Sequence, residues 1–105
     1  MLDEEQFRSH ADRAVEALKQ ALIAQEAEGG FEVEENNGVL QVVFEEPAAK
    51  FVITPNTPVR QIWISALSTS FKLEWDEATA QFVLPKTGES LQPLTARLIQ
   101  QQLES

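Results

Sequence analysis

The first quarter of the chain repeats apolar residues with the period of a helix. Residues 4–27 carry one apolar stripe at three- and four-residue spacing, which predicts a helix with a single buried face. The stripe consists of Phe7, Ala11, Ala14, Leu18 and Leu22. Asp3 is a predicted N-cap, Gln6 completes a capping box, and Leu2 stands opposite Phe7 as a hydrophobic staple. Gly29-Gly30 is expected to end the helix.

From residue 31 the period of the pattern changes to two, which is typical of strands. Asn37-Gly38 predicts a type I′ hairpin turn between the first two strands, and Pro47 should end the second. A third strand around Phe51 and Ile53 precedes an expected turn over 55–58. Further strands are predicted at about 60–65, 71–75 and 81–84.

The last apolar pattern is again helical. Ser90 is its predicted N-cap, and Pro93 falls in the first turn, where a missing N–H is harmless. One stripe contains Leu91, Leu94, Leu98 and Gln102. Short connections favour an antiparallel sheet, and helices with one apolar face should cover the same sheet face. We therefore predict a single α+β domain over residues 1–105, a two-layer α-β sandwich with two helices packed on one face of a roughly six-stranded antiparallel sheet.

This arrangement leaves the second sheet face towards water. Strand alternation assigns to it a mostly polar set, namely Glu32, Glu34, Gln41, Thr54, Gln61, Trp63, Ser65, Lys72 and Glu74. Trp63 is the one large aromatic residue of that set. A lone exposed aromatic residue can simply cover its own sheet, but Trp is also enriched at binding hot spots.

The charge of the chain disfavours several classes of partner. Among 105 residues there are 17 acidic and 8 Lys or Arg residues, for a net charge of −9. Ten acidic and only three basic residues lie within the first 35. Such a chain repels phosphate backbones and anionic lipids, so we expect neither nucleic-acid nor membrane binding, and basic partners or cations are favoured.

Composition also limits the chemistry. The chain has no cysteine and a single histidine, His10, which excludes thiolate metal sites, thiol catalysis and a multi-histidine site within one chain. His10 is read as a partly exposed surface residue. No serine triad or phosphate loop is recognisable, so an enzyme is not expected. There is no apolar run long enough to span a bilayer and no targeting pattern, so the expected location is the bacterial cytoplasm, with the mitochondrial matrix as the alternative if a targeting segment was removed.

The segment from Ile53 to Ser65 contains Thr57-Pro58 followed by Gln61-Ile62-Trp63. It resembles the signature of the frataxin family, which includes the bacterial CyaY-type proteins. The acidic start of the first helix, Gly38-Val39-Leu40, Trp75 and Gly88-Glu89-Ser90-Leu91 resemble the same family in order and spacing. The family fold is the sandwich predicted above.

The resemblance implies an iron-binding regulatory role in iron–sulfur cluster assembly, with docking on the cysteine desulfurase and scaffold complex as a resting monomer. Iron would be held weakly by carboxylates of an acidic ridge, here Asp3, Asp12, Glu16, Glu26, Glu28, Glu32 and Glu34. The partner-facing sheet residues would be Asn56, Gln61, Trp63 and Lys72.

The chain departs from the family pattern in the second half of the first helix, where Lys19-Gln20 and Ile23-Ala24 replace adjacent acids and thin the ridge. Thr54 and Asn56 stand where Asn and Gln are common. Two other functions remain open on the sequence: a ferroxidase or iron store, which would need a denser acid and histidine cluster, and an acidic adaptor with no metal role.

Overall fold

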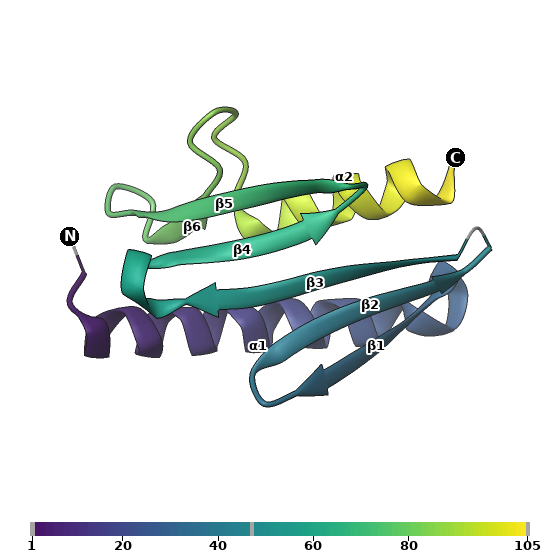
Figure 1. Ribbon diagram of the computed structural model, residues 1–105, viewed down its shortest axis with the longest axis horizontal. Helices are drawn as coiled ribbons and strands as arrows, with labels where there is room; N and C mark the ends of the chain where they lie inside the picture. The colour runs from purple at the N-terminus through teal and green to yellow at the C-terminus, as the bar shows by residue number, and fades with distance from the viewer. Residues whose placement is uncertain (1, 47, 105) are drawn as a thin grey trace.

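The computed structural model describes residues 2–46 and 48–104, and Figure 1 shows two helices behind a twisted sheet. The elements in chain order are α1 (Glu4–Gly29), β1 (Phe31–Asn36), β2 (Val39–Glu45), β3 (Ala48–Asn56), the 3₁₀ turn η1 (Thr57–Val59), β4 (Gln61–Ala66), β5 (Thr69–Asp76), β6 (Gln81–Val83) and α2 (Leu91–Leu103). Pro47, which was expected to end the second strand, lies outside the described residues.

The six strands form one antiparallel sheet in the order of the chain, β1-β2-β3-β4-β5-β6. Asn37 and Gly38 both have positive φ, at 54° and 81°, which confirms the type I′ turn between β1 and β2. The β4–β5 hairpin is also closed by two residues of positive φ, Leu67 and Ser68. Neither residue type favours that conformation, so the sequence indicated a loop between these strands but not its tight two-residue turn.

Both helices cover the same face of the sheet, which confirms the predicted α+β sandwich (Figure 1). The core between the two layers holds one cluster of buried side chains, whose largest fully buried members include Phe7, Phe51, Phe82, Leu18, Leu40, Ile53, Ile62, Ile64, Leu73, Leu94 and Leu98. The α2 stripe is buried as predicted, Gln102 included, and Thr95 and Ile99 are buried beside it.

The start of α1 is capped as its sequence predicts. Gln6 N–H donates to Asp3 Oδ1 over 2.7 Å, and Asp3 N–H donates to Gln6 Oε1 over 3.2 Å. The helix extends to Gly29, two residues past the predicted end, because Gly30 supplies the left-handed C-cap at φ 76°. Val15 is buried where the prediction placed Ala14, which is only half-buried, since a 3.6-residue period rotates the stripe between these neighbours.

One other local prediction was wrong in detail. The turn expected over 55–58 begins later, because β3 continues through Pro55 to Asn56 and the 3₁₀ turn occupies 57–59. Ser90 is the N-cap of α2 as predicted, and its side chain makes no capping hydrogen bond. Within residues 2–46 and 48–104, neither helix combines the length and the apolar character that a bilayer crossing requires.

Candidate functional site

The four residues predicted to face a partner lie together on the outer face of β3, β4 and β5. Register places Thr54, Trp63 and Lys72 opposite one another in one row across these strands. The neighbouring row contains Asn56, Gln61 and Glu74. We call these six residues the sheet patch. All of them are exposed or half-buried, as strand alternation predicted for the face away from the helices.

Trp63 is held in place by its neighbours in the sheet patch. Its Nε1–H donates a hydrogen bond of 2.8 Å to Gln61 Oε1, and Gln61 Nε2 donates over 3.1 Å to Glu74 Oε2. Because the indole can only donate and the carboxylate can only accept, these two bonds determine the orientation of the amide between them. The indole donor is therefore satisfied before any partner arrives.

The charged members of the sheet patch, Lys72 and Glu74, both lie on β5. Lys72 Nζ lies 4.9 Å from the centroid of the Trp63 ring, within the range of a cation–π contact. Glu74 lies in the next row and accepts from Gln61. Sequence reasoning placed Glu74 on this face but did not include it among the site residues, because the side-chain hydrogen bond depends on the β4–β5 register.

The 3₁₀ turn η1 brings Asn56 and Gln61 to opposite positions of the sheet. Arg60 closes this turn in a left-handed conformation at φ 56°. Its backbone N–H donates to the Thr57 carbonyl over 3.1 Å, and its guanidinium Nη1 donates to the same oxygen. The sequence did not indicate this role of Arg60, because no pattern in the neighbouring residues predicts that its side chain bonds to the turn.

The seven carboxylates of the predicted acidic ridge are spread along α1, its N-cap Asp3 and β1. The 26 residues of α1 extend about 39 Å at 1.5 Å per residue, so Asp3 at one end and Glu28 at the other cannot share one ion. Glu32 and Glu34 lie two positions apart and face the outer side of the sheet edge. Within the described part of the chain, no group of three or more Asp, Glu or His side chains forms a metal cage.

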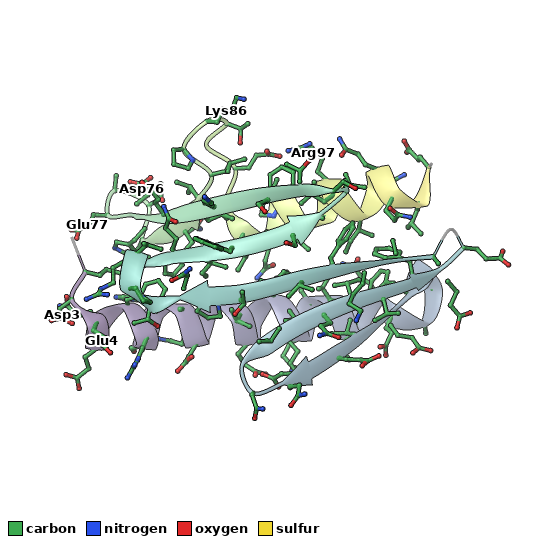
Figure 2. The ribbon with its side chains drawn as sticks, viewed as in Figure 1. Asp3, Glu4, Asp76, Glu77, Lys86 and Arg97 are labelled. Atoms are coloured by element: carbon green, nitrogen blue, oxygen red, sulfur yellow. The ribbon has the colours of Figure 1, made fainter. Side chains whose placement is uncertain are left out.

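Three of the predicted ridge carboxylates already serve structural contacts. Asp3 caps α1, Glu16 accepts from Gln20 over 2.8 Å, and Glu26 accepts from the Val33 N–H over 2.7 Å. Asp12, Glu28, Glu32 and Glu34 are exposed. Figure 2 also shows Asp76, the last residue of β5, and Glu77, which follows it in the β5–β6 turn, at the same end of the molecule as Asp3 and Glu4.

Lys19 interrupts the ridge through an ion pair with β1. Its Nζ lies 2.8 Å from Glu35 Oε1, and the hydrogen bond to that carboxylate raises the pKa of Lys19. Glu35 was not among the predicted ridge residues. The ion pair connects α1 to β1. It also neutralises one carboxylate beside Lys19, where the sequence already indicated fewer acidic residues in the ridge.

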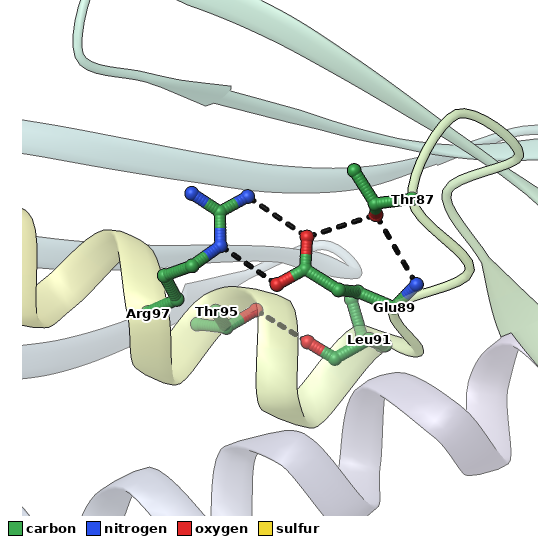
Figure 3. A network of polar contacts seen from close by, with 5 residues as sticks. All are labelled: Thr87, Glu89, Leu91, Thr95 and Arg97. Carbon is green, nitrogen blue, oxygen red and sulfur yellow. Dashed lines mark hydrogen bonds and ion pairs between the residues drawn. The ribbon is translucent and has the colours of Figure 1, made fainter.

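A second polar network holds the loop before α2 (Figure 3). Arg97 Nε and Nη2 donate to the two oxygens of Glu89 over 2.7 and 2.8 Å, and Thr87 Oγ1 donates to the same carboxylate over 2.9 Å. The Arg97 hydrogen bonds, with that of Thr87, lower the pKa of Glu89. The bidentate contact anchors the loop to the second turn of the helix that follows.

The chain is thus a two-layer α-β sandwich with an ordered polar patch on the open face of its sheet. Comparison with known proteins gives the family: residues 1–105 match the Frataxin-like domain, and the chain belongs to that family. It is 29% identical over 101 residues to the iron-sulfur cluster assembly protein CyaY of Pseudomonas fluorescens, covering 96% of this chain and 89% of the relative.

Two further comparisons agree. The chain is 33% identical over 72 residues to the iron-sulfur cluster assembly protein CyaY of Azotobacter vinelandii, covering 69% of this chain and 64% of the relative. The solved structure of the frataxin from Psychromonas ingrahamii superposes with a TM-score of 0.75 at 19% identity, covering 95% of this chain and 91% of that one. That likeness confirms the frataxin fold.

Proposed function

We propose that this protein is a regulator of iron–sulfur cluster assembly that docks on a cysteine desulfurase and its scaffold protein. Membership of the Frataxin-like family and the name shared by its CyaY relatives support the process. The observation that supports docking is the sheet patch, where Asn56, Gln61, Trp63 and Lys72 share one open face.

The sheet patch is suited to recognition because its aromatic residue is pre-ordered. Trp63 is oriented by Gln61 and stacked under Lys72, so little side-chain entropy is lost when a partner covers the ring. Trp residues in such positions are typical hot spots. With the indole N–H already bonded, the partner would meet the ring surface, the Lys72 ammonium and the Glu74 carboxylate.

The acidic ridge would steer the approach. Ten of the 17 acidic residues lie within the first 35 positions, on α1 and β1 and beside α1's start. Their field favours encounter with a basic surface and decays with added salt. The acidic ridge would then supply long-range attraction to the partner, and the sheet patch would supply the short-range contacts.

Iron would be carried by the ridge as cargo, held weakly. Carboxylate oxygens are ligands that hard cations such as iron accept. The ridge residues are spread along α1 and β1 without a cage among the described residues, and Glu26 is engaged by Val33. Such donors fit exchangeable, low-affinity binding, centred on the exposed Glu28, Glu32 and Glu34.

The test is a binding titration against the cysteine desulfurase from the same source, with and without scaffold, at ionic strengths of about 0.01 and 0.15 M. Trp63→Ala and Lys72→Ala should each weaken the complex, the former by about 2 kcal/mol. Lys50→Ala is the matched control, because Lys50 is an exposed lysine of the same sheet, opposite Val43 and away from the patch. Equal effects of Lys50→Ala and Lys72→Ala would remove the patch from the mechanism.

Charge-reversal variants test whether the acidic ridge steers association. Reversal of Asp12 and Glu16 to lysine should slow association and flatten its salt dependence, whereas the same reversal at Glu45 and Glu46, beyond the ridge, should do less. An unchanged salt slope contradicts steering by the ridge. Oxygen-dependent oxidation of Fe²⁺ would instead indicate a ferroxidase, and amide shifts with Fe²⁺ identical to those with Mg²⁺ would indicate an adaptor with no iron role.

A further inference from the structure

An open cavity of about 520 Å³ lies on the helical side of the sheet, away from the sheet patch. Its walls come from the first half of α1, from β6 with the end of β5, and from the start of α2. Cavities of this size fall within the range that binds small molecules in proteins. None of the residues proposed above for partner or iron binding lines it.

One wall of the cavity is aromatic. His10 of α1 stacks on Trp75 of β5, with ring centroids 4.1 Å apart and an interplanar angle of 24°. Trp75 in turn packs edge-on against Phe82, at a centroid distance of 5.1 Å. These rings connect α1 to two strands, and the stacked pair of His10 and Trp75 presents aromatic surface to the cavity.

The polar lining of the cavity contrasts with the rest of the molecule. The chain has 17 acidic residues and 8 Lys or Arg, yet among the described lining residues there is no carboxylate, while Arg13 is present. The ion pairs of residues 2–46 and 48–104 involve Arg8, Lys19 and Arg97, so Arg13 has no carboxylate partner there. Its Nη2 donates to Ser9 Oγ over 3.1 Å.

Hydroxyl and amide groups complete the lining. The Ser90 side chain makes no capping bond to α2, and it lines the cavity with Gln81 and Gln92. These groups can donate hydrogen bonds to an oxygen ligand, and the planar guanidinium of Arg13 matches a carboxylate in two-point geometry. A cation would find only neutral or positive neighbours in this lining.

We propose that this cavity binds a small organic carboxylate with a flat apolar body. The carboxylate would contact Arg13, and the flat body would lie against the wall formed by His10 and Trp75. This inference does not depend on the proposed docking function, because it uses a different face and different residues.

The experiment is a titration of the full-length protein with benzoate, followed by NMR through the Trp75 indole N–H and the His10 ring signals. The Trp63 indole N–H, on the opposite face of the sheet, serves as an internal reference. We expect saturable shifts of the Trp75 and His10 signals with little change at Trp63. Benzamide, which has the same shape without the charge, should bind about tenfold more weakly, as expected for loss of a charge-assisted hydrogen bond.

Arg13→Gln should weaken benzoate binding about tenfold as well, while Arg8→Gln is the matched control from the same helix, since Arg8 is already paired with Glu4. Arg13 is exposed, so the variant should keep the native amide spectrum. Shifts that grow linearly without saturation, equal binding of benzamide, or undiminished binding in Arg13→Gln would each overturn the proposal.

Discussion

Glu26 near the end of α1 accepts a hydrogen bond from the backbone N–H of Val33 in β1, over 2.7 Å. β1 is an edge strand, paired only with β2. An edge strand exposes unpaired N–H groups that can recruit another strand. The carboxylate of Glu26 therefore does two things in this fold: it ties the helix to the sheet and it occupies one donor of the open edge.

The first prediction concerns this contact. Glu26→Ala should lower the free energy of unfolding by about 1–2 kcal/mol, because a half-buried bond to a charged acceptor is lost. Chemical denaturation with two-state analysis measures it. Glu28→Ala, an exposed acid two residues later, should change stability by less than about 0.5 kcal/mol. Similar losses in both variants would show that the contact contributes nothing specific.

The second prediction concerns the order of the sheet patch. Gln61→Ala removes the acceptor of the Trp63 indole, so the indole N–H signal should shift and broaden while stability falls by about 1 kcal/mol. The comparison variant is Gln41→Ala, on the same sheet face but in β2. An unmoved Trp63 signal in Gln61→Ala would mean that the ring is held by packing alone.

The third prediction concerns pH. The pKa of Glu89 is lowered in the folded state by its hydrogen bonds with Arg97 and Thr87. A group whose folded pKa is depressed contributes stability above its unfolded pKa, and this contribution is lost as pH falls through the folded pKa. Glu89→Gln should therefore be less stable than the parent chain at neutral pH, with a gap that closes below the ordinary glutamate pKa of about 4.3.

Thermal unfolding at several pH values measures this difference in stability between the parent chain and the Glu89→Gln variant. The background variant Arg97→Gln provides the control, since without the guanidinium the substitution Glu89→Gln should change stability little at any pH. A stability difference between the parent chain and the Glu89→Gln variant that stays constant from neutral to acidic pH would rule out the linkage.

The fourth prediction concerns the β4–β5 turn. Leu67 and Ser68 have φ of 53° and 61°, a conformation that costs ordinary L-residues about 1 kcal/mol each. Replacing the pair with Asn-Gly should stabilise the protein by about 1 kcal/mol or more, since these residues suit a type I′ turn. The converse change, Asn37→Ala and Gly38→Ala in the β1–β2 turn, should destabilise it. No gain from Asn-Gly at 67–68 would indicate a different turn in solution.

Several parts of the molecule followed directly from local sequence patterns. The capping box of Asp3 and Gln6, the Asn37-Gly38 turn and the α2 stripe are decided by residues within a few positions of one another. The outward placement of Gln61, Trp63 and Lys72 followed from strand period alone. These features depend on short-range stereochemistry and on which face must be buried.

Other parts depended on register and on contacts between distant segments. Pairing of Trp63 with Lys72, and of Gln61 with Glu74, requires the β4–β5 register, which a turn without Gly or Asn did not reveal. The Glu26–Val33 bond, the Lys19–Glu35 ion pair and the His10–Trp75 stack join α1 to strands far along the chain. A one-dimensional pattern carries no information about which polar side chains meet across such distances.

The amino-acid sequence by itself determined the two helices, the antiparallel sandwich, the acidic first third and the signature around Thr57-Pro58 and Gln61-Ile62-Trp63, because each depends on composition, period or short spacing. Only the tertiary structure decided that Glu26 is engaged by the sheet edge, that Trp63 is pre-ordered by its neighbours, and that Arg13 faces a cavity whose described lining holds no carboxylate. These outcomes depend on the packing of α1 and α2 against the sheet, which brings together side chains from distant segments at distances that no local pattern encodes.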